Sequence, residues 1–193
     1  INSACAWGGS DQSLLPEESR QYMAEINGKR ELYRGKPLAT NICMSNPTAR
    51  RIMAKAVADY AENHRNVDYL HVWLADYWNN HCECAECRKM TPSDYYVMVM
   101  NDIDEELTAK TIKAAFEEKN CLIDTHTAVA VSAAERHMNA YKTERKMLTV
   151  STASAFKFAA DVYRSITGCA PSGDVEALDE LSTLTGVPIP SPL

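Results

Sequence analysis

A cysteine-rich stretch with the spacing of metal ligands lies in the middle of the chain, in the run NNHCECAECRKM at residues 79–90. It holds Cys82, Cys84 and Cys87, with His81 beside them, in a chain of 193 residues that has seven cysteines in total. The pair Cys84-x-x-Cys87 has the spacing of half a structural zinc site. Such a site needs four sulfur or nitrogen ligands arranged as a tetrahedron.

The fourth ligand has to come from another part of the chain, because the usual second pair of cysteines or histidines is missing. Cys43 is the long-range candidate, so the predicted ligands of a zinc ion are Cys43, Cys82, Cys84 and Cys87. Two other interpretations stay open: a disulfide between Cys43 and one of the other three, or reduced thiols that only order a loop. The odd cysteine count excludes complete disulfide pairing within one chain.

Asp76 is the candidate catalytic residue. It ends the run VDYLHVWLAD at residues 67–76, whose β-branched and aromatic residues predict a buried parallel strand. Barrels and open sheets of the α/β class place ligand-binding groups at the C-terminal ends of their strands. The rings of Trp73, Tyr77 and Trp78 would suit stacking against a sugar, although a core position and a turn-capping role for Asp76 explain the same residues. Glycoside hydrolysis also needs a second carboxylate, and the sequence identifies none.

Helices dominate the elements expected around these residues. Asn46 and Pro47 are a typical N-cap and first residue of a helix, as are Thr91 and Pro92 for a second helix. Helices are expected over residues 16–28, 46–64, 91–110, 124–142, 155–166 and 174–186, and strands over 67–76 and 146–152. Residues 111–120 are expected to continue the helix of 91–110 or to begin a new one. The order of helix, strand, loop and helix in the first half predicts an α/β fold.

Composition narrows the range of partners. The chain is 46% apolar and 24% charged, as is usual for a globular protein. A net charge of −6 without a basic run argues against a nucleic-acid surface. No apolar run approaches the roughly 18 residues of a membrane-spanning helix. The expected partners are therefore a carbohydrate or a second copy of the chain, with no nucleic acid and no membrane, and the compartment is not indicated.

Three segments of the first half carry a resemblance to a known family: INGKR, CMSNPTARR, and the run VDYLHVWLADYWNNHCECAECRKMTPSDYYVMVMNDIDEEL. Together they make residues 14–108 similar to an uncharacterised bacterial domain family related to α-glucuronidase-type glycoside hydrolases with (β/α)8 barrels. The resemblance implies a partial (β/α) barrel-like unit over residues 1–108. It also implies that Asp76 and the cysteine loop lie at the catalytic face of the barrel and that the substrate is a carbohydrate.

The second half resembles a different family. The segments CLIDTHTAVAVSAAE, LTVSTASAFKF and LDELSTLTGVPIP make residues from about 110 to 193 similar to the C-terminal segment of bacterial threonine synthase. That enzyme uses pyridoxal phosphate (PLP) and has the tryptophan-synthase-β fold, PLP fold type II. The resemblance implies an α/β segment over residues 109–193. It further implies that Ser151 and Thr152 contact the cofactor, with Thr152 facing the pyridine nitrogen.

The chain departs from the threonine synthase pattern in several places. Thr125 stands where the family has the proline of Asp-Pro-His-Thr, and Ala155 replaces a second proline, so two rigid turn residues are lost. The lysine that binds PLP covalently lies upstream of this segment in the family, in a region where this chain carries the other sequence. A glycine-rich phosphate-binding loop is also missing.

The two resemblances together predict a chimeric or fragmentary protein that is not catalytically complete, with a join between Asn101 and Ile112. A continuous amphipathic helix across the join is expected, because Ile103, Leu107 and Ile112 nearly maintain one apolar stripe. On this interpretation PLP binds only if the missing part of threonine synthase is supplied. The alternatives are a zinc-binding structural module and a glycoside-hydrolase-like enzyme completed by another subunit.

Overall fold

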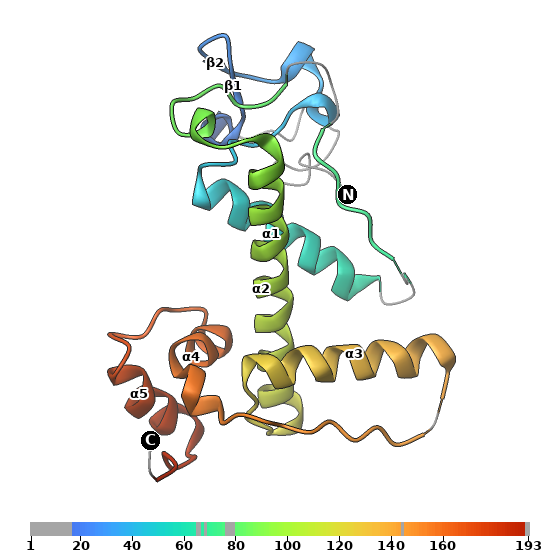
Figure 1. Cartoon of the computed structure of the whole chain (residues 1–193), viewed down its shortest axis with the longest axis vertical. Coiled ribbons are helices and arrows are strands. Elements are labelled where there is room, and N and C mark those ends of the chain that lie inside the picture. The colour runs from blue at the N-terminus through green and yellow to red at the C-terminus, as the bar shows by residue number, and fades with distance from the viewer. Residues whose placement is uncertain (1–16, 65–66, 68, 76–79, 144, 192–193) are drawn as a thin grey trace. The chain divides into compact units, whose positions relative to one another are not determined.

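The computed structural model describes residues 17–64, 67, 69–75, 80–143 and 145–191 (Figure 1). The chain divides into two compact units, Ile1–Glu106 (unit 1) and Leu107–Leu193 (unit 2). In the described residues the fold is mostly helical, with one antiparallel sheet of two strands. None of the described helices combines the length and apolar character needed to cross a membrane.

Helix α1 (Pro47–Asn63) begins where the sequence predicts. The side chain of Asn46 caps the helix by accepting hydrogen bonds from the backbone N–H groups of Thr48 and Ala49, at 2.9 and 3.2 Å. Met53 and Val57 lie on its buried face. The prediction of a capped amphipathic helix is confirmed, because the N-cap, proline and apolar spacing are all local signals.

Helix α2 (Pro92–Lys119) covers the helix predicted over 91–110 and its expected continuation over 111–120, and it has residues in both units. At its start, the carboxylate of Asp94 accepts hydrogen bonds from the backbone N–H and the hydroxyl of Thr91. In unit 1, the guanidinium of Arg50 in α1 binds the carboxylate of Asp102 in α2 at 2.6 Å. The helix is continuous through the region of the predicted join, as the apolar stripe indicates.

The predicted helix over residues 16–28 is wrong beyond Tyr22. A 3₁₀ helix, η3 (Glu17–Tyr22), is followed by an antiparallel hairpin of β1 (Glu25–Ile26) and β2 (Lys29–Arg30). The turn between the strands is Asn27-Gly28, with φ of 51° and 73°. Asn-Gly is the preferred pair for a two-residue hairpin turn, which needs positive φ at both positions.

The predicted buried strand over residues 67–76 is also wrong in its described part. Residues 67 and 69–75 form no strand, and Tyr69 is 85% exposed. A buried parallel strand needs neighbouring strands and covering helices, whereas the described part of unit 1 has only the two-stranded antiparallel sheet. The barrel-like unit is therefore not seen. Asp76, Tyr77 and Trp78 lie outside the described residues.

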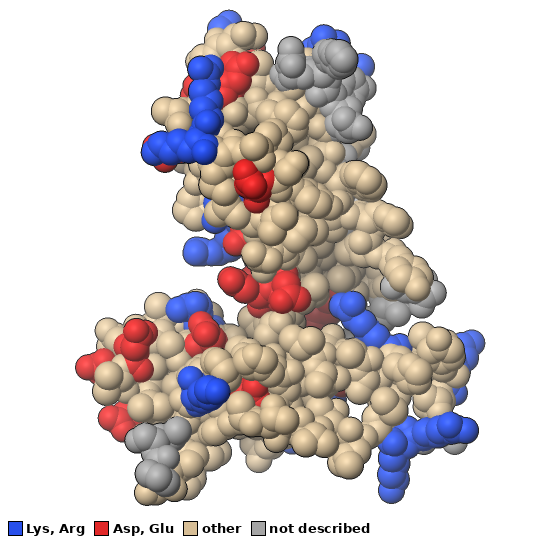
Figure 2. Space-filling model, in the orientation of Figure 1, with Lys and Arg blue, Asp and Glu red and all other residues tan. Residues whose placement is uncertain are grey.

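The described part of unit 1 also contains three shorter 3₁₀ helices: η4 (Tyr33–Gly35), η5 (Pro37–Ala39) and η6 (Cys87–Lys89). Charged side chains of both signs are scattered over the face drawn in Figure 2, with uncharged surface between them. The buried side chains of unit 1 come from the loops as well as from the helices, as Met23 and Ile42 show.

Unit 2 is built from helices around a small apolar core. Besides the end of α2 it contains α3 (Thr125–Tyr141), η7 (Ala155–Phe158), α4 (Ala159–Thr167) and α5 (Glu176–Thr185). The core includes Ile112, Phe156, Val162, Ile166 and Leu181. Helix α5 ends at Gly186 in the left-handed conformation, as the sequence predicts.

The predicted strand over residues 146–152 is wrong. This segment has no strand partner in the described part of unit 2, and Leu148 is 90% exposed. Its alternating apolar residues suit a strand, but strand burial depends on a neighbouring strand that local sequence does not supply.

Asp124 fixes the start of α3 and is 1% exposed. Its carboxylate accepts hydrogen bonds from the backbone N–H groups of His126 and Thr127 and from the Thr127 hydroxyl. Burial raises the pKa of Asp124, but these hydrogen bonds outweigh it, so the pKa is lowered. Because the folded pKa lies below the unfolded one, the carboxylate stabilises unit 2 above the unfolded pKa of about 4, and this contribution disappears as the pH falls through the folded pKa.

We expect Asp124→Ala to destabilise α3 by about 1–2 kcal/mol at neutral pH, since two backbone donors and a hydroxyl lose their acceptor. Hydrogen exchange of the α3 amides in the two proteins measures this difference. Asp124→Asn is the matched control, because asparagine also caps helices well. Equal exchange in the wild type and the alanine variant would show that the cap contributes nothing.

Candidate metal centre

Three segments of unit 1 bring the four predicted ligands together. The segment of Cys43 pairs with residues 22–24, since Cys43 N–H donates to the Tyr22 carbonyl at 2.7 Å. The segment of Cys82 lies beside the hairpin, since Glu83 N–H donates to the Glu25 carbonyl at 2.7 Å. Hairpin, Cys43 segment and cysteine loop therefore meet at one place.

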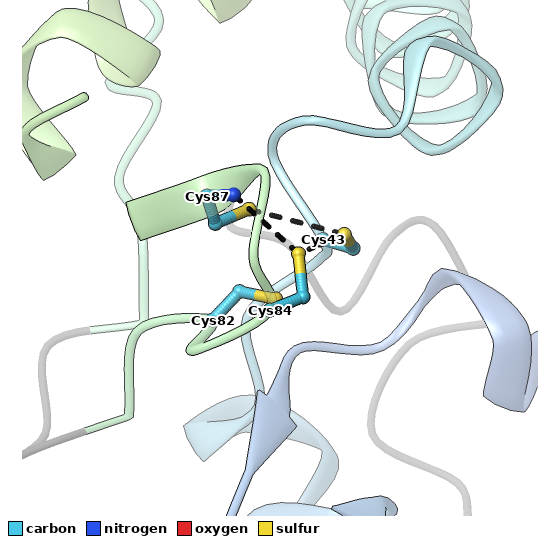
Figure 3. Close-up of side chains that lie close together, drawn as sticks. All are labelled: Cys43, Cys82, Cys84 and Cys87. Carbon is cyan, nitrogen blue, oxygen red and sulfur yellow. Dashed lines mark hydrogen bonds between the residues drawn. The ribbon is translucent and has the colours of Figure 1, made fainter. Parts of the chain in front are cut away.

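The thiol sulfurs of Cys43, Cys82, Cys84 and Cys87, here called the cysteine cluster, all lie within 4.8 Å of one another (Figure 3). The Sγ atom of Cys43 is 3.8 Å from that of Cys84 and 3.9 Å from that of Cys87. Bonds of about 2.3 Å from zinc to four sulfurs would place neighbouring sulfurs about 3.8 Å apart in a regular tetrahedron. The sulfur positions therefore fit a tetrahedral metal ion.

The structure has no disulfide between Cys43 and the other three cysteines of the cluster. All four cysteines of the cluster are free thiols, and the measured separations are far longer than the roughly 2.05 Å of a sulfur–sulfur bond. Cys121 and Cys169, in unit 2, are free and exposed. His81 is exposed and does not belong to the cluster.

Burial makes the cluster a closed site. Cys43 and Cys87 are buried, and Cys82 and Cys84 are half-buried. The hydroxyl of Tyr95 in α2 donates to the carbonyl of Glu86 at 2.8 Å and so holds the cysteine loop against the helix. Four sulfurs would fill every position of a tetrahedral ion and leave none for a substrate, which is typical of structural metal sites.

Backbone N–H groups point at three of the sulfurs. Glu25 N–H donates to Cys82 at 3.2 Å, and Ser45 N–H donates to Cys87 at 3.3 Å. Cys87 N–H lies 3.5 Å from the sulfur of Cys84. Such donors stabilise the negative charge of a thiolate, the form in which cysteine binds metals.

Interactions within the cluster shift the cysteine pKa values in opposite directions. A hydrogen bond from Cys82 lowers the pKa of Cys43, with help from Ser45 and Arg30 and against the effect of burial. The same interaction raises the pKa of Cys82, and burial raises it further. The interaction therefore favours the thiolate form of Cys43 and the protonated form of Cys82.

The pKa values of Cys84 and Cys87 are also shifted in opposite directions. Burial raises the pKa of Cys84, but hydrogen bonds from Cys87 and Ser45 outweigh it, so the pKa is lowered. Burial raises the pKa of Cys87, and the hydrogen bonds from Ser45 do not cancel this effect. Burial lowers the pKa of the nearby Arg30, but the negative sulfurs of the cluster outweigh it and raise the pKa.

Two buried asparagines, which no sequence pattern identifies, hold the backbone segments next to the cluster in place. The side chain of Asn41 exchanges two hydrogen bonds with the backbone of Ala75, at 2.8 and 3.1 Å. The side chain of Asn80 donates to the carbonyls of Ala39 and Ala75, at 2.9 and 2.7 Å. These amides tie residues 75 and 80 to the segment before Cys43.

The predicted cofactor residues of unit 2 are both exposed. The hydroxyl oxygen of Ser151 lies 3.0 Å from the Thr127 hydroxyl oxygen and 3.1 Å from the carbonyl of Ala153. Ser151 thus belongs to the polar group around the Asp124 cap. The roles of Ser151 and Thr152 toward PLP stay predictions, as do the role of Asp76 and the binding of a carbohydrate.

Comparison with known proteins bears on unit 2. A scan against protein-family models matched residues 127–188 to the family described as "Threonine synthase, C-terminal". No curated protein and no solved structure matched the chain. The match does not reach residues 14–108, so no finding supports their resemblance to α-glucuronidase-related proteins. Residues 127–188 are thus similar to the C-terminal part of threonine synthase.

Proposed function

We propose that unit 1 is a zinc-binding structural module whose metal ligands are the four sulfurs of the cysteine cluster. The observation that carries this proposal is the spacing of the sulfurs, which matches the edges of a zinc–sulfur tetrahedron. The ligands come from positions 43 and 82–87, so one ion would link segments about forty residues apart. A link of this kind stabilises a small unit that has few regular elements of its own.

The chemistry of the donors favours zinc over harder ions. Thiolates prefer soft or borderline metals, and a tetrahedral set of four sulfurs is typical of zinc or iron. Four thiolates and one Zn²⁺ carry a net charge of −2, which the guanidinium of Arg30 partly offsets. Arg30 is held in place by its hydrogen bond to the Met23 carbonyl, at 2.6 Å, and by an ion pair with Glu25.

The test is the metal content of the protein purified without chelators, measured by inductively coupled plasma mass spectrometry. We expect about one zinc per chain. A double variant, Cys121→Ser with Cys169→Ser, should keep the metal, because these exposed thiols lie outside the cluster. Iron in place of zinc would change the identity of the metal, and less than about a tenth of an equivalent of any metal, after incubation with zinc, would contradict the proposal.

A second proposal concerns unit 2 and is supported by the family match over residues 127–188. We propose that this segment is related to the PLP-binding part of threonine synthase and binds the cofactor only together with a polypeptide that supplies the lysine. Purified chain mixed with PLP should therefore show no absorbance band of a lysine-bound cofactor. A stable band that survives dialysis would contradict this proposal.

A further inference from the structure

Ser45 contacts three of the four sulfurs of the cysteine cluster, although no sequence pattern identifies it as part of a metal site. Its hydroxyl oxygen lies 3.2 Å from the sulfur of Cys87, 3.4 Å from that of Cys43 and 3.5 Å from that of Cys84. Its backbone N–H donates separately to Cys87, at 3.3 Å. One side chain thus contacts three of the four candidate metal ligands.

The turn around Ser45 holds this hydroxyl in place. Asn46 N–H donates to the Cys43 carbonyl at 3.0 Å, which closes the turn that contains Ser45. The next residue along, Asn46, caps α1, and the guanidinium of Arg50 in α1 donates to the carbonyl of Met44 at 2.8 Å. The hydroxyl therefore approaches the sulfurs from a backbone fixed on both sides.

The hydroxyl of Ser45 can form hydrogen bonds with the cluster both when the cysteines are reduced thiols and when they are metal-bound thiolates. It has one proton to donate and two lone pairs to accept with. Next to reduced thiols it can accept S–H donors and donate once. When the cysteines bind a metal they are thiolates and can only accept, so the hydroxyl proton must point to one sulfur. Cys87 is the nearest acceptor, at 3.2 Å.

We propose that Ser45 is a positioning residue of the metal centre: its hydroxyl orients the thiolate of Cys87 and covers the face of the cluster formed by the sulfurs of Cys43, Cys84 and Cys87. This inference rests on the proposed zinc binding. Groups that hydrogen-bond metal ligands fix the ligand orientation, and their loss weakens metal binding about 10- to 100-fold. The hydroxyl also hinders a competing chelator from reaching the ion through that face.

Ser45→Ala is the direct test, because it removes the hydroxyl and keeps the backbone N–H bond to Cys87. We expect zinc affinity, measured by competition with a chromophoric chelator, to fall about 10- to 100-fold. In the cobalt-substituted protein, the sulfur-to-cobalt charge-transfer band should shift, since the thiolate loses a hydrogen bond. Ser45→Thr, which keeps a hydroxyl, should restore most of both properties.

The matched control is Ser93→Ala. Ser93 is exposed in the first turn of α2, and its side chain makes none of the hydrogen bonds found in the described part of the chain. It should bind zinc as the wild type does. Circular dichroism of the zinc-loaded variants checks that each is folded before affinities are compared.

The outcomes separate this inference from the proposed function. A wild-type protein that binds no zinc would overturn both. A wild type that binds zinc, with Ser45→Ala unchanged in affinity and cobalt spectrum, would overturn only the role of Ser45. Equal losses in Ser45→Ala and Ser45→Thr would also overturn it, because the hydroxyl would then not be the group that matters.

Discussion

Cys43→Ser is expected to weaken zinc binding at least about a hundredfold and to loosen unit 1. Cys43 is the ligand contributed from outside the loop at residues 82–87, and it lies 3.8 and 3.9 Å from two of the loop sulfurs. With serine in its place, the ion would keep three ligands from one loop and lose its link to the segment that leads into α1.

The loss should be local. A hundredfold change in zinc affinity corresponds to about 2.7 kcal/mol. Because zinc binds the folded form of unit 1, weaker binding lowers the free energy of unfolding of unit 1 by about this amount. Hydrogen exchange should therefore rise in the segments around the cluster, including the hairpin of β1 and β2, and should stay unchanged in α4 and α5 of unit 2.

Cys121→Ser is the matched control for this experiment. Cys121 is a free, exposed thiol outside the cluster, so its replacement should leave zinc affinity and hydrogen exchange around the cluster unchanged. If Cys43→Ser binds zinc as tightly as the wild type, Cys43 is not a ligand, and zinc does not link the Cys43 segment to the loop at residues 82–87.

Zinc binding is expected to release two to three protons near pH 7. All four sulfurs must be thiolates to bind zinc, so zinc displaces the protons that the free cluster holds. Hydrogen bonds lower the pKa of Cys43 to about 4, so this thiol holds almost no proton near pH 7. Burial raises the pKa of Cys84, but hydrogen bonds outweigh it and lower the pKa, so Cys84 holds at most one proton. The pKa values of Cys82 and Cys87 are raised, so each of these thiols holds one.

The sign of the pH dependence follows from that release. With two to three protons displaced, zinc affinity should rise about a hundred- to a thousandfold for each unit of pH gained near neutrality and should fall equally steeply as the solution is acidified. Isothermal titration calorimetry in buffers of different ionisation enthalpy counts the protons directly. Release of about four protons would show that the cluster does not lower the pKa of any thiol.

The metal-free protein should respond to pH through the same groups. The folded pKa of Cys43 is depressed, so its contribution to stability grows as the pH rises toward the ordinary thiol pKa and is lost in acid. The folded pKa of Cys82 is raised, so its contribution is present below the ordinary thiol pKa and is lost in stronger base.

Local signals in the sequence predicted local structure well. Asn46 and Pro47 identify the start of α1, and Gly186 identifies the end of α5. The Cys84-x-x-Cys87 spacing brings two sulfurs together within one loop. Asn27-Gly28 was an equally local signal for a hairpin, but the helix-like residues before it led to the wrong prediction.

Properties that depend on distant partners were not predictable in the same way. Residues 67–76 and 146–152 are apolar enough for buried strands, yet their described parts form no strand. Ser45 and Arg30 carry no recognisable metal-site signature. Their roles appear only when the hairpin, the Cys43 segment and the cysteine loop are folded together, because the contacts join residues up to 57 positions apart.

X-ray absorption spectroscopy at the zinc edge tests the central claim most directly, because it reports the atoms bound to the ion in the intact protein. We expect four sulfur neighbours at about 2.3 Å and no oxygen or nitrogen bound to the ion. A spectrum with two or more nitrogen or oxygen neighbours would contradict zinc binding by the four cysteines.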